Sequence, residues 1–284
     1  MTNDPEPSVF QEMTWEEISA AARADTPIVI PIGATEQHGR HLPVCTDWVL
    51  PERIAREAGR VRSLIVGPFL PFGYRSRPGS GGGQHFPGTV SLRATTFMSL
   101  LEDVLVELKR CGFRNIVVYN WHFENKGFVY EPAYLISGQN PELKVVVIED
   151  AMPDFTPERQ KAIWPEGFPG LALEHAAVIE TSLWMYHEPS VVRSDRMAAD
   201  APQRVVNHDV VPIDTRMSTA SGSLSSPVAA SAEKGRLLTE WLVERLIAVV
   251  DEEFPNHGRH TGGREVDHEL HQPETTESAA DLGR

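Results

Sequence analysis

The chain has 284 residues, of which 41% are hydrophobic and 23% charged, as in an ordinary globular protein with one large domain. Its formal net charge of −14 argues against a nucleic-acid partner, because such a partner requires a basic surface. No apolar run approaches the roughly 20 residues of a membrane helix. The start, MTNDPEPSVF, lacks the features of a secretory signal. We therefore expect no membrane partner and a cytoplasmic location.

Short β-branched runs alternate with helix-like segments along the chain. The expected strands are 28–32, 64–68, 115–119 and 144–149, and the expected helices are 48–59, 97–111, 174–187 and 233–253. This alternation predicts an α/β fold with a mostly parallel central sheet and helices on both sides. We expect residues 1–255 to form the domain. Residues 256–284 are polar, lack periodicity and hold four of the eleven histidines, which predicts a disordered tail.

Polar side chains follow the first and third expected strands. Glu36, His38 and Asp47 come after the first, and His122 and Glu124 come after the third. In open α/β sheets the loops at the carboxyl ends of the strands converge on one side, where ligands bind. Two histidines and three carboxylates are a donor set for two borderline divalent ions, Zn²⁺ or Mn²⁺. The alternative is that Glu36 and Asp47 cap helices and that His122 is a loop histidine with satisfied hydrogen bonds.

Two further motifs resemble known functional signatures. The stretch SGGGQHFPGT at 80–89 is not a phosphate-binding P-loop, because it lacks the GK[ST] signature. It carries His85, which fits either a structural or a ligand-supporting role. The H-x-E at 122–124 is not the zinc deaminase motif, since Cys45 and Cys111 do not form P-C-x-x-C.

A histidine also precedes the expected helix at 174–187. Hydrolysis needs a proton donor for the leaving group, and histidine titrates in the useful pH range. His175, next to Glu174, is the available candidate. An ordinary helix-start histidine is the alternative.

Together these motifs resemble those of the creatininase family of creatinine amidohydrolases. The matching stretches are GATEQHGRH with TD at 46–47, GYRS, SGGGQHFPGT, NWHFEN, PEGF, EHAAVIETS, EKG and EEFP, and they span roughly residues 14 to 255. The resemblance implies a three-layer αβα fold, two divalent metal ions and usually a homohexamer; we expect zinc as the metal, with manganese as the alternative at one site. It also implies hydrolysis of a C–N bond in a small, cyclic amide such as creatinine.

The resemblance further implies a role for each matching residue. Glu36 and His122 correspond to ligands of one ion, His38 and Glu124 to ligands of the other, and Asp47 to a bridge between them. His175 corresponds to the catalytic histidine, with Glu124 assisting in proton transfer. Ser80, Glu174, Trp121 and Phe123 are the candidates for contact with substrate.

The sequence departs from the family pattern around the substrate. Where creatinine hydrolases have two tryptophans over the substrate, this chain has Ala151 and Leu171. A neighbouring aspartate becomes Ala172, and a glycine before the metal-site histidine becomes Trp121. Trp121, Trp164 and Trp48 are candidates to replace the lost cover. The alternatives for function are therefore hydrolysis of an N-formyl or other small amide, a peptide or a ring ketone, or metal binding without catalysis.

Overall fold

The computed structural model describes residues 6–77, 83–199, 208–211, 214–215 and 218–255. Within these residues five strands form one sheet in the order β1, β3, β2, β4, β5, and every pairing is parallel. The strands are β1 Ser8–Val9, β2 Ile28–Ile32, β3 Ile65–Val66, β4 Asn115–Asn120 and β5 Lys144–Ile148. Ile28 of β2 lies opposite Ile65 of β3 and Ile116 of β4. All carboxyl ends therefore lie at the same edge.

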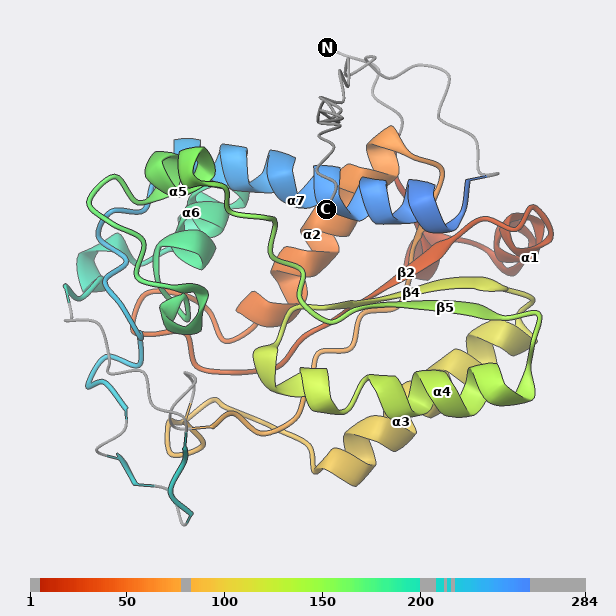
Figure 1. The fold of residues 1–284 in the computed structure, drawn as a ribbon, viewed down its shortest axis with the longest axis horizontal. Coiled ribbons are helices and arrows are strands. Elements are labelled where there is room, and N and C mark those ends of the chain that lie inside the picture. Colours follow the sequence, from red (N-terminus) through yellow and green to blue (C-terminus); the bar gives the residue numbers. More distant parts are fainter. Residues whose placement is uncertain (1–5, 78–82, 200–207, 212–213, 216–217, 256–284) are drawn as a thin grey trace, which may run out of the picture.

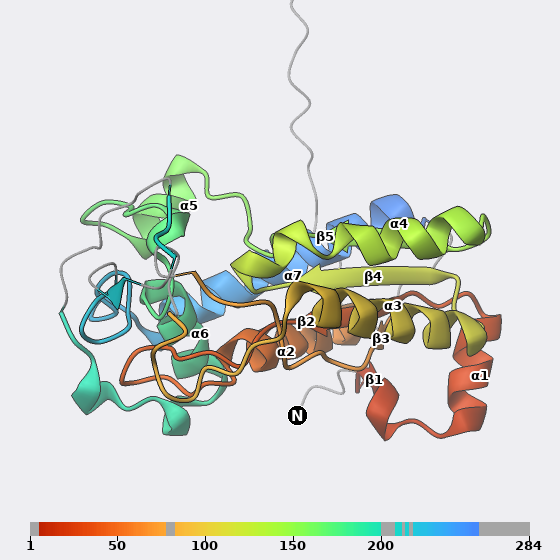
Figure 2. The same ribbon diagram turned by 90° about the horizontal axis from the view of Figure 1, so that it is seen from below.

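Helices cover both faces of this sheet and complete three layers (Figure 1). The helices are α1 Trp15–Arg23, α2 Thr46–Val61, α3 Ala94–Arg110, α4 Tyr130–Gln139, α5 Pro157–Ile163, α6 Val178–His187 and α7 Ala232–Glu253. α2 and α7 lie over one face, and α3 and α4 lie over the other, the side from which Figure 2 views the molecule. The predicted αβα sandwich with a parallel sheet is confirmed.

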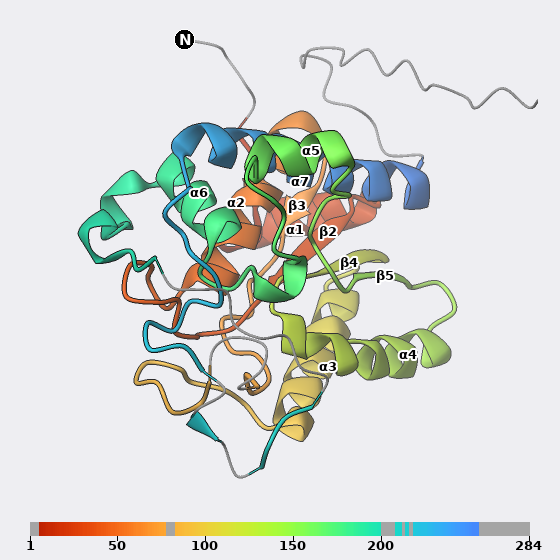
Figure 3. The same ribbon diagram turned by 60° about the vertical axis from the view of Figure 1, so that its left-hand side comes forward.

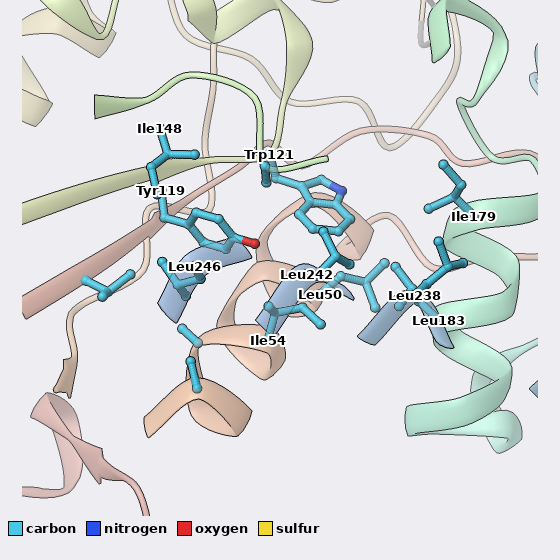
Figure 4. Packing of buried hydrophobic residues seen from close by; sticks show 14 of the residues in the cluster. Leu50, Ile54, Tyr119, Trp121, Ile148, Ile179, Leu183, Leu238, Leu242 and Leu246 are labelled. Atoms are coloured by element: carbon cyan, nitrogen blue, oxygen red, sulfur yellow. The ribbon is translucent and has the colours of Figure 1, made fainter. Parts of the chain in front are cut away.

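Each central strand is buried on both faces because its side chains alternate between two hydrophobic clusters. Val29 of β2 points into the cluster under α2, α6 and α7, whereas Ile28 and Ile30 point into the cluster under α3 and α4. Figure 4 shows the first cluster, in which Tyr119 and Trp121 lie over Leu50 and Leu242 of two different helices. Packed side chains thus cover both faces of the sheet.

Several expected boundaries differ from the structure. The helix expected at 174–187 begins only at Val178, because Ala176 has a φ of 51° in the left-handed region. The strand expected at 64–68 is shorter, and β1, α1, α4 and α5 were not expected. Every helix in the described residues is too short or too polar to cross a bilayer. The expected tail at 256–284 lies outside the described residues.

Candidate metal centre

Two segments at the carboxyl edge of the sheet, together with the first turn of α2, carry the predicted ligands. Residues 33–45 form the loop between β2 and α2, and the short 3₁₀ helix η3, Phe123–Gly127, follows β4. Figure 3 brings forward the end of the molecule to which these strands lead, where α5 and α6 lie. Because β2 and β4 are neighbours in the sheet, segments far apart in sequence meet here.

The first group of ligands joins the two segments to the start of α2. Glu36, Asp47 and His122 are buried and offer donor atoms within 4.8 Å of one another. Nδ1 of His122 lies 3.1 Å from Oε2 of Glu36 and 3.1 Å from Oδ2 of Asp47. The three side chains therefore converge on one point.

A second group lies on the other side of Asp47. His38, His175 and Glu180 also offer donor atoms within 4.8 Å of one another. Nε2 of His38 lies 3.0 Å from Oδ1 of Asp47 and 3.5 Å from Oε1 of Glu180. Asp47 thus presents one oxygen to His38 and the other to His122, the arrangement required of a bridging ligand.

The hydrogen bonds of the two histidines test whether this donor set fits a cation. Nδ1 of His38 donates to the backbone oxygen of Glu36 at 3.0 Å, and Nε2 of His122 donates to the backbone oxygen of Tyr74 at 3.1 Å. Each ring therefore turns its other nitrogen toward carboxylates, and Nε2 of His38 is buried there without a hydrogen bond. A backbone carbonyl behind a histidine is typical of metal ligands. The residues fit divalent cations such as Zn²⁺ and Mn²⁺.

The electrostatics of the site also favour added positive charge. Burial lowers the pKa of His38 and of His122, but the surrounding carboxylates outweigh it and leave both pKa values well above the ordinary one. Burial raises the pKa of Asp47, yet the two histidines overcome this and hold it below its usual range. Burial raises the pKa of Glu36 to about 6. Several carboxylates buried this closely need a compensating charge, which a metal ion supplies.

Glu124 lies at the edge of the first group and is turned toward Arg77. Its Oε1 accepts a hydrogen bond from the backbone nitrogen of Arg77 at 3.2 Å, and the guanidinium of Arg77 lies 3.8 Å away. Its Oε2 lies 3.5 Å from Nε2 of His122, on the far side of the ring from Asp47. The structure therefore places Glu180, rather than Glu124, beside His38.

A cavity of about 290 Å³ opens beside the two groups. Its lining includes the predicted contact residues Trp121, Phe123 and Glu174, together with Leu171 and Ala172. Phe123 is 49% exposed, and the ammonium of Lys126 lies 4.7 Å from its ring centre. The predicted substrate residue Ser80 lies outside the described residues.

The three tryptophans proposed to cover the substrate lie in different parts of the structure. Trp121 is buried at the cavity wall, and its Nε1 points toward Glu180 at 3.5 Å. Trp48 stacks on Phe69 with ring centres 4.9 Å apart, and Trp164 is buried in the core. Ala151 is buried in the core and is not part of the cavity lining. Of the three indoles, only that of Trp121 lines the cavity.

Glu174 and His175 lie in the segment before α6, where the backbone is not helical. The carboxylate of Glu174 accepts hydrogen bonds from Nε1 of Trp164 at 2.9 Å and from the backbone nitrogen of Ile179 at 3.0 Å. Burial raises the pKa of Glu174 to about 8. Burial and the neighbouring His38 hold the pKa of His175 well below its ordinary value. Its ring centre lies 4.4 Å from that of His38, so His175 is part of the centre.

The capping alternative for Asp47 is wrong. α2 begins at Thr46 with Cys45 as its N-cap residue, and no side chain caps it. His41 lies outside both groups, because its Nε2 contacts the hydroxyl of Thr181 at 2.9 Å. His85 is likewise in neither group.

Two residues at the centre were not predicted from the sequence. Glu180 was given no role; it lies in the first turn of α6, and its Oε2 accepts a hydrogen bond from the backbone nitrogen of Ala176 at 2.7 Å. Gln37, between the predicted ligands Glu36 and His38, carries no acid or imidazole and so gave no chemical signal. Its amide nitrogen lies 3.1 Å from Nε2 of His175.

The fold and the site define the class of the protein: an α/β protein with a buried centre of histidines and carboxylates suited to divalent metals. Residues 11–250 match the family described as creatininase, creatinine amidohydrolase. The chain belongs to the creatininase family.

Individual relatives agree with this assignment. A creatinine amidohydrolase of Pseudomonas putida is 38% identical over 257 residues, which cover 87% of this chain and 98% of that protein. A mycofactocin precursor peptide peptidase of Mycobacterium tuberculosis is 28% identical over 264 residues, covering 84% and 92%. The solved structure described as "Creatininase Mn" superposes with a TM-score of 0.84 and 37% identity, covering 88% of this chain and all of that one. The chain is therefore a hydrolase of this family.

Proposed function

We propose that the protein is a binuclear metal-dependent amidohydrolase that cleaves a C–N bond in a small cyclic amide, creatinine or a close relative. The observation that carries the proposal is the bridging position of Asp47 between His38 and His122, beside a cavity of about 290 Å³. The similarity to the Pseudomonas creatinine amidohydrolase over nearly its whole length supports the same reaction.

The residues divide between holding the metals and moving protons. Glu36 and His122 would hold one ion, His38 would hold the other together with Glu124 or Glu180, and Asp47 would bridge them. When bound, such ions make a water molecule acidic near neutral pH and polarise a carbonyl group. We expect zinc, with manganese possible at one site.

His175 is the proposed group that delivers a proton to the departing nitrogen. Its ring lies against His38 and lines the cavity, so it is within reach of a substrate held there. Glu124, held at the cavity by Arg77, is the proposed second acid–base group. Trp121, Phe123 and Glu174 would form the walls that hold the substrate.

A second candidate function is hydrolysis of a larger, linear amide. Leu171 is 41% exposed at the cavity and Ala172 has no bulk to close it, so the wall is open where an aromatic cover is expected. The mycobacterial relative is described as a peptide peptidase. An open cavity wall would admit a substrate of that larger kind.

A turnover screen separates these functions. The metal-loaded protein is incubated with creatinine, other cyclic amides, N-formyl amino acids, short peptides and a cyclic ketone, with the chelated protein as control. The proposal expects creatine or another ring-opened product from the cyclic amides. Faster turnover of peptides would favour the second candidate, and no turnover by fully loaded protein would contradict both.

The assembly and location follow from the family resemblance. We propose a homohexamer in the cytoplasm. Large apolar side chains that remain exposed on the chain, such as Trp15 at 76% and Tyr134 at 71%, offer surface for subunit contacts. Analytical ultracentrifugation would give a species of six chains, and a monomer at micromolar concentration would contradict this part of the proposal.

A further inference from the structure

The side-chain amide of Gln37 is fixed in one orientation by the backbone around it. Its Oε1 accepts from the backbone nitrogen of Gly39 at 2.9 Å, and its Nε2 donates to the backbone oxygen of Gly222 at 2.9 Å. A flipped amide would place its NH₂ against the N–H of Gly39 and its oxygen against the oxygen of Gly222. Both contacts would then join like groups, so the amide stays as it is.

The same amide nitrogen lies 3.1 Å from Nε2 of His175. An amide NH₂ group donates hydrogen bonds and does not accept them. Nε2 of His175 must therefore be the ring nitrogen with the lone pair. In the neutral ring the hydrogen is then on Nδ1.

The loop at 219–224 is shaped to receive this amide. Gly222 has a φ of 90°, and a Cβ at this position would lie 2.0 Å from Oε1 of Gln37. The hydroxyl of Thr219 accepts from the backbone nitrogen of Gly222 at 3.1 Å, which stabilises the turn. The backbone nitrogen of Leu224 donates to the backbone oxygen of His175 at 3.1 Å. One loop thus holds both Gln37 and His175.

We propose that Gln37 is a positioning residue that fixes the tautomer of His175, with the lone pair on Nε2 and the hydrogen on Nδ1. In this tautomer Nε2 is occupied by the amide of Gln37, and the ring hydrogen that His175 can give to a substrate is the one on Nδ1. The catalytic consequence rests on the proposed function, whereas the state of the ring does not. Gln37 acts through His175 and is not itself expected to touch the substrate.

The state of the ring is read directly by nitrogen NMR. Zinc-loaded protein labelled with ¹⁵N-histidine gives the protonation of each ring nitrogen, and the spectrum of a His175→Asn variant identifies the His175 signals. The wild type should show hydrogen on Nδ1 only. Gln37→Glu, whose carboxylate accepts, should place hydrogen on Nε2. A wild-type ring with hydrogen on Nε2, or a ring unchanged in Gln37→Glu, would overturn the proposal.

Kinetics test the consequence on the same proteins. Gln37→Glu should lower kcat at least about 10-fold with KM little changed, because a histidine in the wrong protonation state is a poor catalyst. Gly222→Ala should displace the amide of Gln37 and so shift the His175 signals, although residue 175 itself is unchanged. This variant tests the proposal if Gln37→Glu does not fold. Gln160→Glu removes another amide that donates to a backbone oxygen, that of Phe155 at 2.9 Å, and should change neither readout.

The outcomes separate this proposal from the proposed function. The predicted NMR states without turnover of any amide would uphold the role of Gln37 and contradict the amidohydrolase. Turnover that is unaffected by Gln37→Glu, at unchanged metal content, would overturn the role of Gln37 alone.

Discussion

The carboxylate of Asp47 lies 3.0 Å from Nε2 of His38 through its oxygen Oδ1. Its second oxygen lies 3.1 Å from Nδ1 of His122. Asp47 is in the first turn of α2, which packs against β2 and is fixed by the core. α2 therefore places one side chain between two histidines that follow different strands, and the proposed metal centre depends on that side chain.

Removal of metal should destabilise the fold. The buried carboxylates of Glu36, Asp47 and Glu180 would lose their compensating charge, and ligand linkage predicts a cost of about 2–4 kcal/mol. We expect the chelated protein to melt roughly 5–15 °C lower than the loaded protein. Chelator presaturated with zinc is the control, and equal melting temperatures would contradict a structural contribution of metal.

Replacement of His175 should impair catalysis and leave metal binding intact. Loss of a proton-transferring group costs about 10²- to 10⁴-fold in rate. His175→Asn should therefore lower kcat by this amount while the metal content stays at the wild-type value. His85→Asn is the control, because His85 packs against Phe86 and lies in neither of the two clusters at the candidate centre. Full turnover by His175→Asn would rule out its proposed role.

Glu174 should make stability depend on pH. Burial raises its pKa to about 8, from an ordinary value of 4.5 in the unfolded chain. Between these values the folded state binds more protons than the unfolded state, so the contribution of Glu174 to stability falls as the pH rises. Glu174→Gln removes this dependence, and its stability relative to wild type should grow by about 1–3 kcal/mol from pH 5 to pH 8.

Urea unfolding of both proteins at the two pH values measures this difference. Glu158→Gln is the control, since Glu158 is exposed and its backbone hydrogen bond lowers its pKa. That variant should differ from wild type equally at both pH values. A Glu174→Gln difference that does not change with pH would contradict a buried, protonated carboxyl.

An aromatic residue at position 171 should favour a small flat substrate. Leu171→Trp adds apolar surface at the open wall of the cavity, worth about 1–3 kcal/mol of contact. We expect kcat/KM for creatinine to rise roughly 10-fold and that for larger amides to fall. Leu135→Trp is the matched control, because Leu135 is similarly exposed, at 40%, but lies on α4 away from the cavity. Equal effects of the two variants would dismiss Leu171 as a determinant of specificity.

The sheet was predictable where the sequence carries a long, one-sided or fully apolar pattern. IVIPI at 28–32 is buried throughout and was placed correctly, and the apolar stripe at 233–253 is the helix α7. β1 has only two residues and shows no pattern to detect. α1 has few large apolar residues, but Thr14 and Glu17 form a capping box that signals its start.

The clustering of the candidate ligands was predictable where they follow strands directly. Glu36, His38 and His122 come at the carboxyl ends of two neighbouring strands, so the topology alone brings them together. Glu180 reaches the centre from α6, and no local pattern shows which helix packs there. The turn of Glu124 toward Arg77 likewise depends on a contact between distant segments.

The metal content of the Asp47→Ala protein tests the central claim most directly. Wild type and variant are loaded with zinc or manganese, desalted, and measured by inductively coupled plasma mass spectrometry, with Glu36→Gln as a second variant. The account predicts two ions per chain in the wild type, one in Glu36→Gln and none in Asp47→Ala. A wild type without bound metal, or an Asp47→Ala protein that keeps two ions, would contradict it.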